Sequence, residues 1–442
     1  MSADPRSAGA ALAALIVLAA GAGCEGVRAA GAPEAPLWLH HPGTALSVVM
    51  RRTLTAPTRA VGEPYERGKP EIDPPHRRVF VGSSDHGFYA LRVEDGTTIW
   101  RFETLGAVQC EPLYDPKEDT VYFGSNDGAL YKVRAVDGKL LWRFATNAEV
   151  ARRPVLRDGV VYATNANDTL LAIDAGTGKM RWHQHRTPAF GMEVAGYSGP
   201  ALGTDKVYTA FSDGVVLAYS LVDGSEQWPS VDLAAEAEQS TGEDVPRYLD
   251  VDTTPIVSRI AAGDVVFVGS YAGGVFALDA QNGSRAWVND KVTGVTELML
   301  WEQPAHPPRN GDGPDTPAKS ILLAASGLTG LWALDPNDGR TLWRRNLPEG
   351  GISAPVAFAG ALLISSTRYG IFLFSPIDGA VIDGIDTGGG FAMTPAAYGR
   401  HAFVMSNTGI LLGLQIEPPP SPKPGLQIEP PPIPTPKPPT KG

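Results

Sequence analysis

One pattern recurs along almost the whole chain and constrains the fold more than any other feature. Each copy contains an apolar run, a polar turn, a second apolar run, a tight turn at glycine and a short run around a tryptophan. Two of the copies read VYFGSNDGALYKVRAVDGKLLW and VVFVGSYAGGVFALDAQNGSRAW. Seven segments follow this form, and an eighth, AFVMSNTGILLGL, stops early. Most repeats also open with a short strand that contains a proline, which makes four strands per unit. Four-stranded units at a spacing of about 40 residues or more predict a β-propeller.

The glycine turns and the tryptophans define the register of the repeat. Asp or Asn precedes six of the seven glycines, which is turn chemistry that requires positive φ. The turn glycines are Gly96, Gly138, Gly178, Gly224, Gly283, Gly339 and Gly379. A tryptophan stands four residues after each of the first six, at Trp100, Trp142, Trp182, Trp228, Trp287 and Trp343. Asp383 takes that position in the seventh unit. We expect these tryptophans to dock one blade on the next, since each ring can bury about 150–250 Å².

The repeat count predicts an all-β fold, an eight-bladed β-propeller of four-stranded antiparallel blades that occupies residues 37–416. The eighth unit, about residues 391–416, supplies only three strands. The segment PLWLHHPG near the N-terminus can supply the fourth, with Trp38 as its docking tryptophan. An N-terminal strand in the last blade closes the ring and leaves no free sheet edge there.

The two ends of the chain differ in composition from the repeats. The run ALAALIVLAAGAGC has the length and small-residue end of a secretory signal, so residues 1–24 are interpreted as a signal peptide. A cysteine at the end of such a run resembles a lipoprotein site, which makes Cys24 the expected lipid attachment point; plain secretion is the alternative. Residues 25–36 are a tether. Residues 417–442 are a proline-rich tail, either a spacer or a ligand of a proline-binding domain.

Charge and cysteine content narrow the function classes. The net charge of −11 argues against nucleic-acid binding, which needs a basic surface. The second of the two cysteines, Cys110, has no partner if Cys24 is acylated, and it is then expected to be a small buried apolar residue.

Two long links interrupt an otherwise regular pattern. Residues Arg186–Gly199 lead into the fourth blade and Pro229–Thr253 lead into the fifth. Links of this kind lie on one face of a propeller, where long loops on a rigid ring tend to bind partners. Two further insertions, roughly residues 62–77 and 302–319, are expected between first and second strands and therefore on the opposite face.

The second long link ends in a motif that resembles a catalytic one. LDVDTTPIV has the DxDxT spacing of a phosphatase nucleophile, with Asp250 and Asp252 as its carboxylates. That chemistry requires an apolar parallel strand within an α/β sheet, whereas the context here is polar and all-β. A Ca²⁺ or Mg²⁺ site would need further oxygen ligands. We therefore interpret Thr253, Thr254 and Pro255 as the entry into a propeller strand and the aspartates as groups on an exposed lip just before it.

Other combinations of reactive residues are weaker. His183 and His185 share one strand face, but no third metal ligand is evident. The sequence thus gives no catalytic residue and no metal ligand. The repeat also resembles that of the eight-bladed quinoprotein dehydrogenases, which hold pyrroloquinoline quinone against an adjacent Cys-Cys disulfide. This chain has no Cys-Cys pair, so no cofactor and no cofactor-binding residue are assigned.

The repeats, the lipoprotein-like leader and LDVDTTPIV together resemble the BamB family, lipoproteins of the outer-membrane β-barrel assembly machine. The resemblance implies a non-enzymatic scaffold, lipid-anchored at the periplasmic face of the outer membrane, whose partners are a BamA-like assembly subunit and incoming outer-membrane proteins. It also implies partner-binding residues on the two long links. These are Met192, Val194, Ala195, Asp250 and Asp252. Ala195 replaces an arginine of the family pattern. The alternative from another class is a periplasmic quinoprotein or another ligand-binding propeller.

Overall fold

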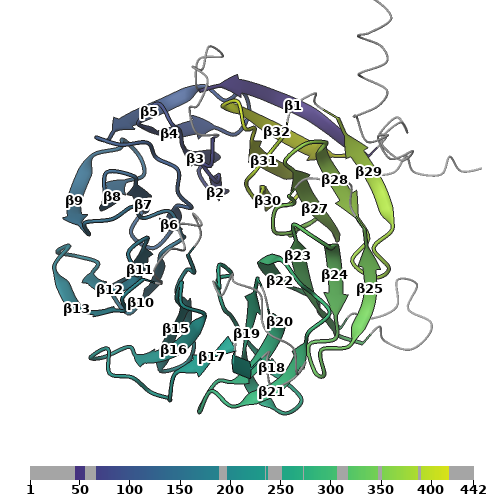
Figure 1. The fold of residues 1–442 in the computed structure, drawn as a ribbon. Helices are drawn as coiled ribbons and strands as arrows, with labels where there is room; N and C mark the ends of the chain where they lie inside the picture. Colours follow the sequence, from purple (N-terminus) through teal and green to yellow (C-terminus); the bar gives the residue numbers. More distant parts are fainter. Residues whose placement is uncertain are drawn as a thin grey trace, which may run out of the picture.

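The computed structural model is a ring of eight four-stranded sheets around a central channel (Figure 1). It describes residues 45–54, 66–188, 197–233, 235–236, 251–271, 273–305, 317–346, 351–386 and 390–417. In seven sheets the strands follow chain order from the channel outward, in the eighth the first strand of the chain is outermost, and neighbouring strands are antiparallel. The predicted eight-bladed propeller is confirmed.

Each of the first seven blades is built from four consecutive strands. The strands of blades 1 and 2 are β2 (Glu71–Asp73), β3 (Arg78–Gly82), β4 (Gly87–Arg92), β5 (Thr98–Glu103), β6 (Leu113–Asp115), β7 (Thr120–Ser125), β8 (Ala129–Arg134) and β9 (Leu140–Ala145). Those of blades 3 and 4 are β10 (Val155–Arg157), β11 (Val160–Asn165), β12 (Thr169–Asp174), β13 (Met180–His185), β14 (Ala201–Leu202), β15 (Lys206–Ala210), β16 (Val215–Ser220) and β17 (Val231–Asp232).

Blades 5 to 7 repeat the arrangement. They contain β18 (Ile256–Ile260), β19 (Gly263–Ser270), β20 (Gly274–Asp279), β21 (Arg285–Asn289), β22 (Val295–Gln303), β23 (Lys319–Ser326), β24 (Gly330–Leu334), β25 (Thr341–Arg345), β26 (Val356–Phe358), β27 (Ala361–Ser366), β28 (Gly370–Phe374) and β29 (Val381–Ile385). Blade 8 combines β30 (Ala396–Tyr398), β31 (His401–Met405) and β32 (Ile410–Ile416) with β1 (Leu46–Thr53).

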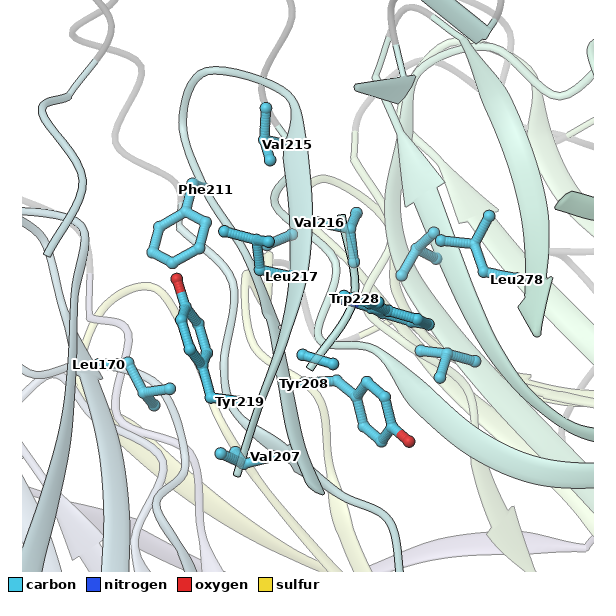
Figure 2. Packing of buried hydrophobic residues seen from close by; sticks show 14 of the residues in the cluster. Leu170, Val207, Tyr208, Phe211, Val215, Val216, Leu217, Tyr219, Trp228 and Leu278 are labelled. Atoms are coloured by element: carbon cyan, nitrogen blue, oxygen red, sulfur yellow. The ribbon is translucent and has the colours of Figure 1, made fainter. Parts of the chain in front are cut away.

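The middle strands explain the apolar runs of the repeat. All six residues of β7 are buried, because both faces of this strand are covered by neighbouring blades. The largest cluster of buried residues spans blades 3 to 5, where the rings of Tyr208 and Trp228 lie 5.3 Å apart (Figure 2). The core is therefore distributed between blades around the ring.

The tryptophans dock as the repeat predicts. Trp100 of blade 1 donates from Nε1 to the carbonyl oxygen of Ala135 in blade 2, at 2.9 Å. Its ring lies over Gly138, whose φ is +71°, and a Cβ on that glycine would come within 2.8 Å of the ring. Corresponding bonds join Trp142 to Ala175 and Trp287 to Pro336.

The ring closes in blade 8, but not with the segment that the sequence analysis favours. The fourth strand is β1, paired along its length with β32, and PLWLHHPG lies outside the described residues. Met50 takes the docking position: a Cβ on Gly96 of blade 1 would lie 2.8 Å from its sulfur. The expectation for Trp38 is therefore wrong, because a flexible apolar thioether fills the gap and leaves no tryptophan signal in β1.

Asp383 has a defined role at the same junction. It replaces the docking tryptophan of blade 7, and its Oδ2 accepts hydrogen bonds from Ala45 N at 2.8 Å and Leu46 N at 2.7 Å. At five other junctions a docking tryptophan donates to the next blade, whereas here a carboxylate accepts from it. The exception in the repeat thus lies where the closing strand β1 begins.

The strand directions define two faces of the ring. The loop face carries the links from an outer strand to the next inner strand, and the turn face carries the glycine turns. β22 ends at Gln303 and β23 begins at Lys319, so the insertion predicted at roughly 302–319 falls between a first and a second strand, at the turn face. The expectation for residues 62–77 is wrong, because β2 begins at Glu71 and only Pro74–Arg77 separate it from β3. The extra residues precede an inner strand and belong to the loop-face link.

Candidate functional site

The two long links end side by side on the loop face. We call residues 197–200 and 251–255 the lead-ins to blades 4 and 5, since they directly precede β14 and β18. Ser198 Oγ donates to Thr253 O at 2.9 Å, and Gly199 N donates to Thr254 Oγ1 at 3.1 Å. The lead-ins are thus joined to each other, although 55 residues separate each bonded pair in the sequence.

Thr253, the residue between the second aspartate and the threonine of the DxDxT motif, has a structural role. Thr253 is fully buried, and its hydroxyl donates to Gly269 O at 2.9 Å and accepts from Gly269 N at 2.8 Å. This pair of bonds fixes the lead-in against β19 of the same blade. It supports the interpretation of Thr253, Thr254 and Pro255 as the entry into a propeller strand, since β18 begins at Ile256.

The expected partner-binding residues are only partly within the described chain. Asp252 is partly buried rather than exposed on a lip, and its backbone carbonyl accepts a hydrogen bond from Arg152. Asp250 lies one residue before the described segment. Met192, Val194 and Ala195 lie outside the described residues, as does Cys24.

Arg152, which the sequence analysis did not single out, connects the lead-ins to the channel. It precedes β10 of blade 3, and its guanidinium donates to Tyr197 O of blade 4 and to Asp252 O of blade 5, the latter at 2.7 Å. Its Nη1 also pairs with Glu297 Oε1 of blade 6 at 2.8 Å. A single side chain therefore binds three other blades, and partners so distant in sequence give no local signal.

Further ion pairs extend this arrangement across the channel. Lys69 pairs with Glu111 at 3.0 Å, and Arg153 pairs with both carboxylate oxygens of Glu71 at 2.7 Å. Together with Arg152 and Glu297 they form what we call the ionic layer, three cations and three carboxylates. Glu111 and Glu297 line a cavity of about 150 Å³ toward the loop face and another of about 510 Å³ lined by the inner strands.

Opposite charges nearby outweigh the effect of burial on two members of the ionic layer, Arg152 and Glu111. Burial acts to lower the pKa of Arg152, but the carboxylates of Glu297 and Glu111 outweigh it and raise the pKa above its ordinary value. Burial acts to raise the pKa of Glu111, yet Lys69 and Arg152 hold it below the ordinary range. Arg152 and Glu111 therefore carry opposite charges at neutral pH.

The described residues contain one group whose oxygen and nitrogen atoms could surround a metal ion, Asp73, His76 and Asp119. Arg78 lies among them: its Nε donates to Asp73 Oδ2 at 2.6 Å, and its Nη2 donates to Asp119. The guanidinium already supplies the positive charge that these carboxylates need. The group is better explained as an ion-pair network between blades 1 and 2.

The residues at the channel do not fit a quinone cofactor. Cys110, next to the ionic-layer residue Glu111, is buried, and burial raises its thiol pKa to about 12. Its sequence neighbours are Gln109 and Glu111, so an adjacent disulfide cannot form. The ionic layer also crosses the channel. His183 and His185 lie on the exposed side of β13, and neither belongs to the metal-type group found within the described chain.

Comparisons with known proteins agree with this geometry. The family model of the outer membrane protein assembly factor BamB matches residues 89–305 and 329–417. BamB of Legionella pneumophila is 27% identical over 239 residues, which cover 52% of this chain and 53% of that protein. The match thus spans about half the length of that curated relative.

Structural and quinoprotein relatives complete the comparison. The crystal structure of BamB from Moraxella catarrhalis superposes with a TM-score of 0.63 at 15% identity, covering 84% of this chain and 99% of that one. The dehydrogenase subunit of the quinone-type alcohol dehydrogenase of Gluconacetobacter polyoxogenes is 30% identical over 201 residues. That match covers 43% of this chain and 24% of that protein.

Fold and site define an eight-bladed propeller of quinoprotein-type repeats whose channel is crossed by ion pairs and whose two long links meet on one face. Within that class the chain belongs to the BamB family of outer membrane protein assembly factors, because the family model matches well over half of it. The resemblance inferred from the repeats and LDVDTTPIV is confirmed.

Proposed function

We propose that this chain is a non-enzymatic scaffold lipoprotein that binds a BamA-like, barrel-forming assembly subunit through its loop face. The observation that carries the proposal is the joining of the two lead-ins, which presents both long links at one place on the ring. Asp250, Asp252, Met192, Val194 and Ala195 are the proposed contact residues. A lipid on Cys24 holds the ring at the periplasmic face of the outer membrane.

The proposed mechanism is that of a rigid ring that presents preformed loops. A standard specific interface buries about 1,600 Å² in total, which two long links and their surroundings can supply. Incoming outer-membrane proteins are a second proposed class of partner. They would pair with exposed outer strands by β-augmentation.

Among the described residues, no helix has the length and apolarity to cross a membrane.

The decisive experiment is capture of the assembly subunit by the double variant Asp250→Arg, Asp252→Arg. We expect capture to fall at least tenfold, because a charge reversal at an interface introduces repulsion. Since Asp252 is partly buried, the melting temperature of each single variant must be measured too, and Asp250→Arg is the cleaner probe. Unchanged capture by both variants would refute the proposed docking residues.

The second candidate function, a periplasmic quinoprotein, is favoured by the 30% identity to a quinone-type dehydrogenase subunit. Reconstitution with pyrroloquinoline quinone and Ca²⁺ tests it directly. A stoichiometric quinone absorbance that survives gel filtration would support the quinoprotein, and its absence would leave the scaffold as the better account.

A further inference from the structure

We propose that Arg152 is a positioning residue that holds the lead-ins to blades 4 and 5 as one unit, so that both long links are presented together. Its effect on partner binding rests on the proposed function. Its effect on the lead-ins themselves does not, and can be measured without any partner.

The geometry requires an arginine. Nε donates to Tyr197 O, Nη2 donates to Asp252 O and Nη1 donates to Glu297, so three nitrogens of one planar group have different partners. A lysine has a single nitrogen on a flexible stem and cannot reproduce this fork. The residues bound lie 45, 100 and 145 positions along the chain, in three successive blades.

Tyr197 is held at both ends by the same short segment. Arg152 binds its carbonyl oxygen, while its phenolic oxygen accepts a hydrogen bond from Ala151 N and donates to Glu149 O at 3.1 Å. The lead-in to blade 4 is therefore fixed by residues that precede β10. The lead-in to blade 5 is bound to that segment through the guanidinium of Arg152, which adds a second connection to the direct hydrogen bonds between the lead-ins.

The ionic layer makes the connection stiff. Arg152 is mostly buried, with 17% of its side chain exposed, and Glu297 fixes the orientation of its guanidinium. If either lead-in moves away, a buried N–H loses its acceptor beside charges that stay in place, which is unfavourable. Movement of one lead-in is thereby coupled to the other. Preorganised links lose less conformational freedom on binding, which favours affinity.

Arg153 offers a matched control. It is the next residue, it is also ion-paired, and its partners are Glu71 of blade 1 and the carbonyl of Pro112 in blade 2. These hydrogen bonds reach neither lead-in, so Arg153→Met removes an equal charge from the channel and leaves the proposed connection in place.

The test is hydrogen exchange of the full chain, comparing Arg152→Met, Arg152→Lys and Arg153→Met with the unchanged protein. We expect Arg152→Met to speed exchange of peptides covering 197–200 and 251–255 together, by about tenfold or more. Arg152→Lys should keep the positive charge but not the slow exchange of these peptides. Arg153→Met should leave the exchange rates of both peptides unchanged. Glu297→Gln, which removes the orienting carboxylate, is a milder variant should Arg152→Met fail to fold.

Unchanged exchange at both lead-ins, faster exchange at only one, or an equal response to Arg153→Met would overturn the proposal. Capture of the assembly subunit then separates the two ideas. If Arg152→Met speeds exchange at both lead-ins and reduces capture, the result supports the coupling and its role in docking. Faster exchange with full capture, while Asp250→Arg still loses capture, overturns the role of Arg152 in docking. Full capture by Asp250→Arg and by the double variant refutes the proposed docking residues. No capture by the unchanged chain refutes the proposed function, and both outcomes leave the coupling standing.

Discussion

At the scale of the residue, the turn glycine of each blade meets two requirements at once. Gly138 has φ +71° and also lies against the ring of Trp100. Gly159 has φ +73° in a turn where nothing lies within 4 Å of a Cβ. Both glycines have a left-handed backbone, but only Gly138 lies under a docking tryptophan. Substituting each in turn therefore distinguishes the cost of backbone strain from the cost of steric overlap.

We therefore predict that Gly138→Ala lowers the free energy of unfolding by about 2–4 kcal/mol, from a left-handed backbone and overpacking against Trp100. Gly159→Ala should cost only about 1 kcal/mol, because it meets backbone strain alone. Urea denaturation of both variants measures the difference. Equal losses would show that the tryptophan yields to the added methyl group.

Glu111 makes the ionic layer sensitive to acid. Its pKa is lowered from 4.5 in the folded protein, so its ion pairs stabilise the fold above the unfolded pKa and this contribution disappears as pH falls through the folded pKa. We predict that Glu111→Gln is less stable than the unchanged chain at pH 7 and that the gap narrows below about pH 4.5. Thermal melts from pH 7 to 3 test this. Glu103→Gln, at a site with 75% of the side chain exposed, is the control and should show no such gap.

At the scale of the element, the closing strand β1 shows where sequence patterns succeed and where they stop. The glycine–tryptophan spacing was sufficient to predict the docking contacts and the blade count. It could not locate β1, because Met50 replaces the expected tryptophan and Asp383 replaces another. Arg152 was missed for a different reason, since its partners are brought near only when the ring closes.

Asp383 gives a test of how β1 is held. We predict that Asp383→Ala lowers the free energy of unfolding by about 3 kcal/mol and speeds hydrogen exchange at the start of β1, because Ala45 N and Leu46 N lose their acceptor. Asp383→Asn retains one acceptor oxygen, so its free energy of unfolding should lie between those of Asp383→Ala and the unchanged protein. Exchange at 45–53 that matches the unchanged protein would indicate that pairing with β32 alone holds the strand.

At the scale of the whole molecule, both ends of the described chain meet in one blade. Glu417 N donates to Ala45 O at 2.7 Å, directly beyond the last pair of β1 and β32. The proline-rich segment that follows contributes no described strand. The stability of the ring should thus depend on β32 and not on the residues after Glu417.

We predict that a chain ending at Glu417 melts within about 1 °C of the full chain, because it keeps every described residue. A chain ending at Ser406 loses β32, and with it the buried side chains Leu411, Leu412 and Leu414. It also leaves β1 and β31 without the strand that joins them, exposing two sheet edges where the ring should close. We expect this chain to lose its cooperative melt and to aggregate, as followed by circular dichroism and light scattering. A cooperative melt near that of the full chain would mean that seven blades close without the eighth, and that pairing of β1 with β32 is dispensable.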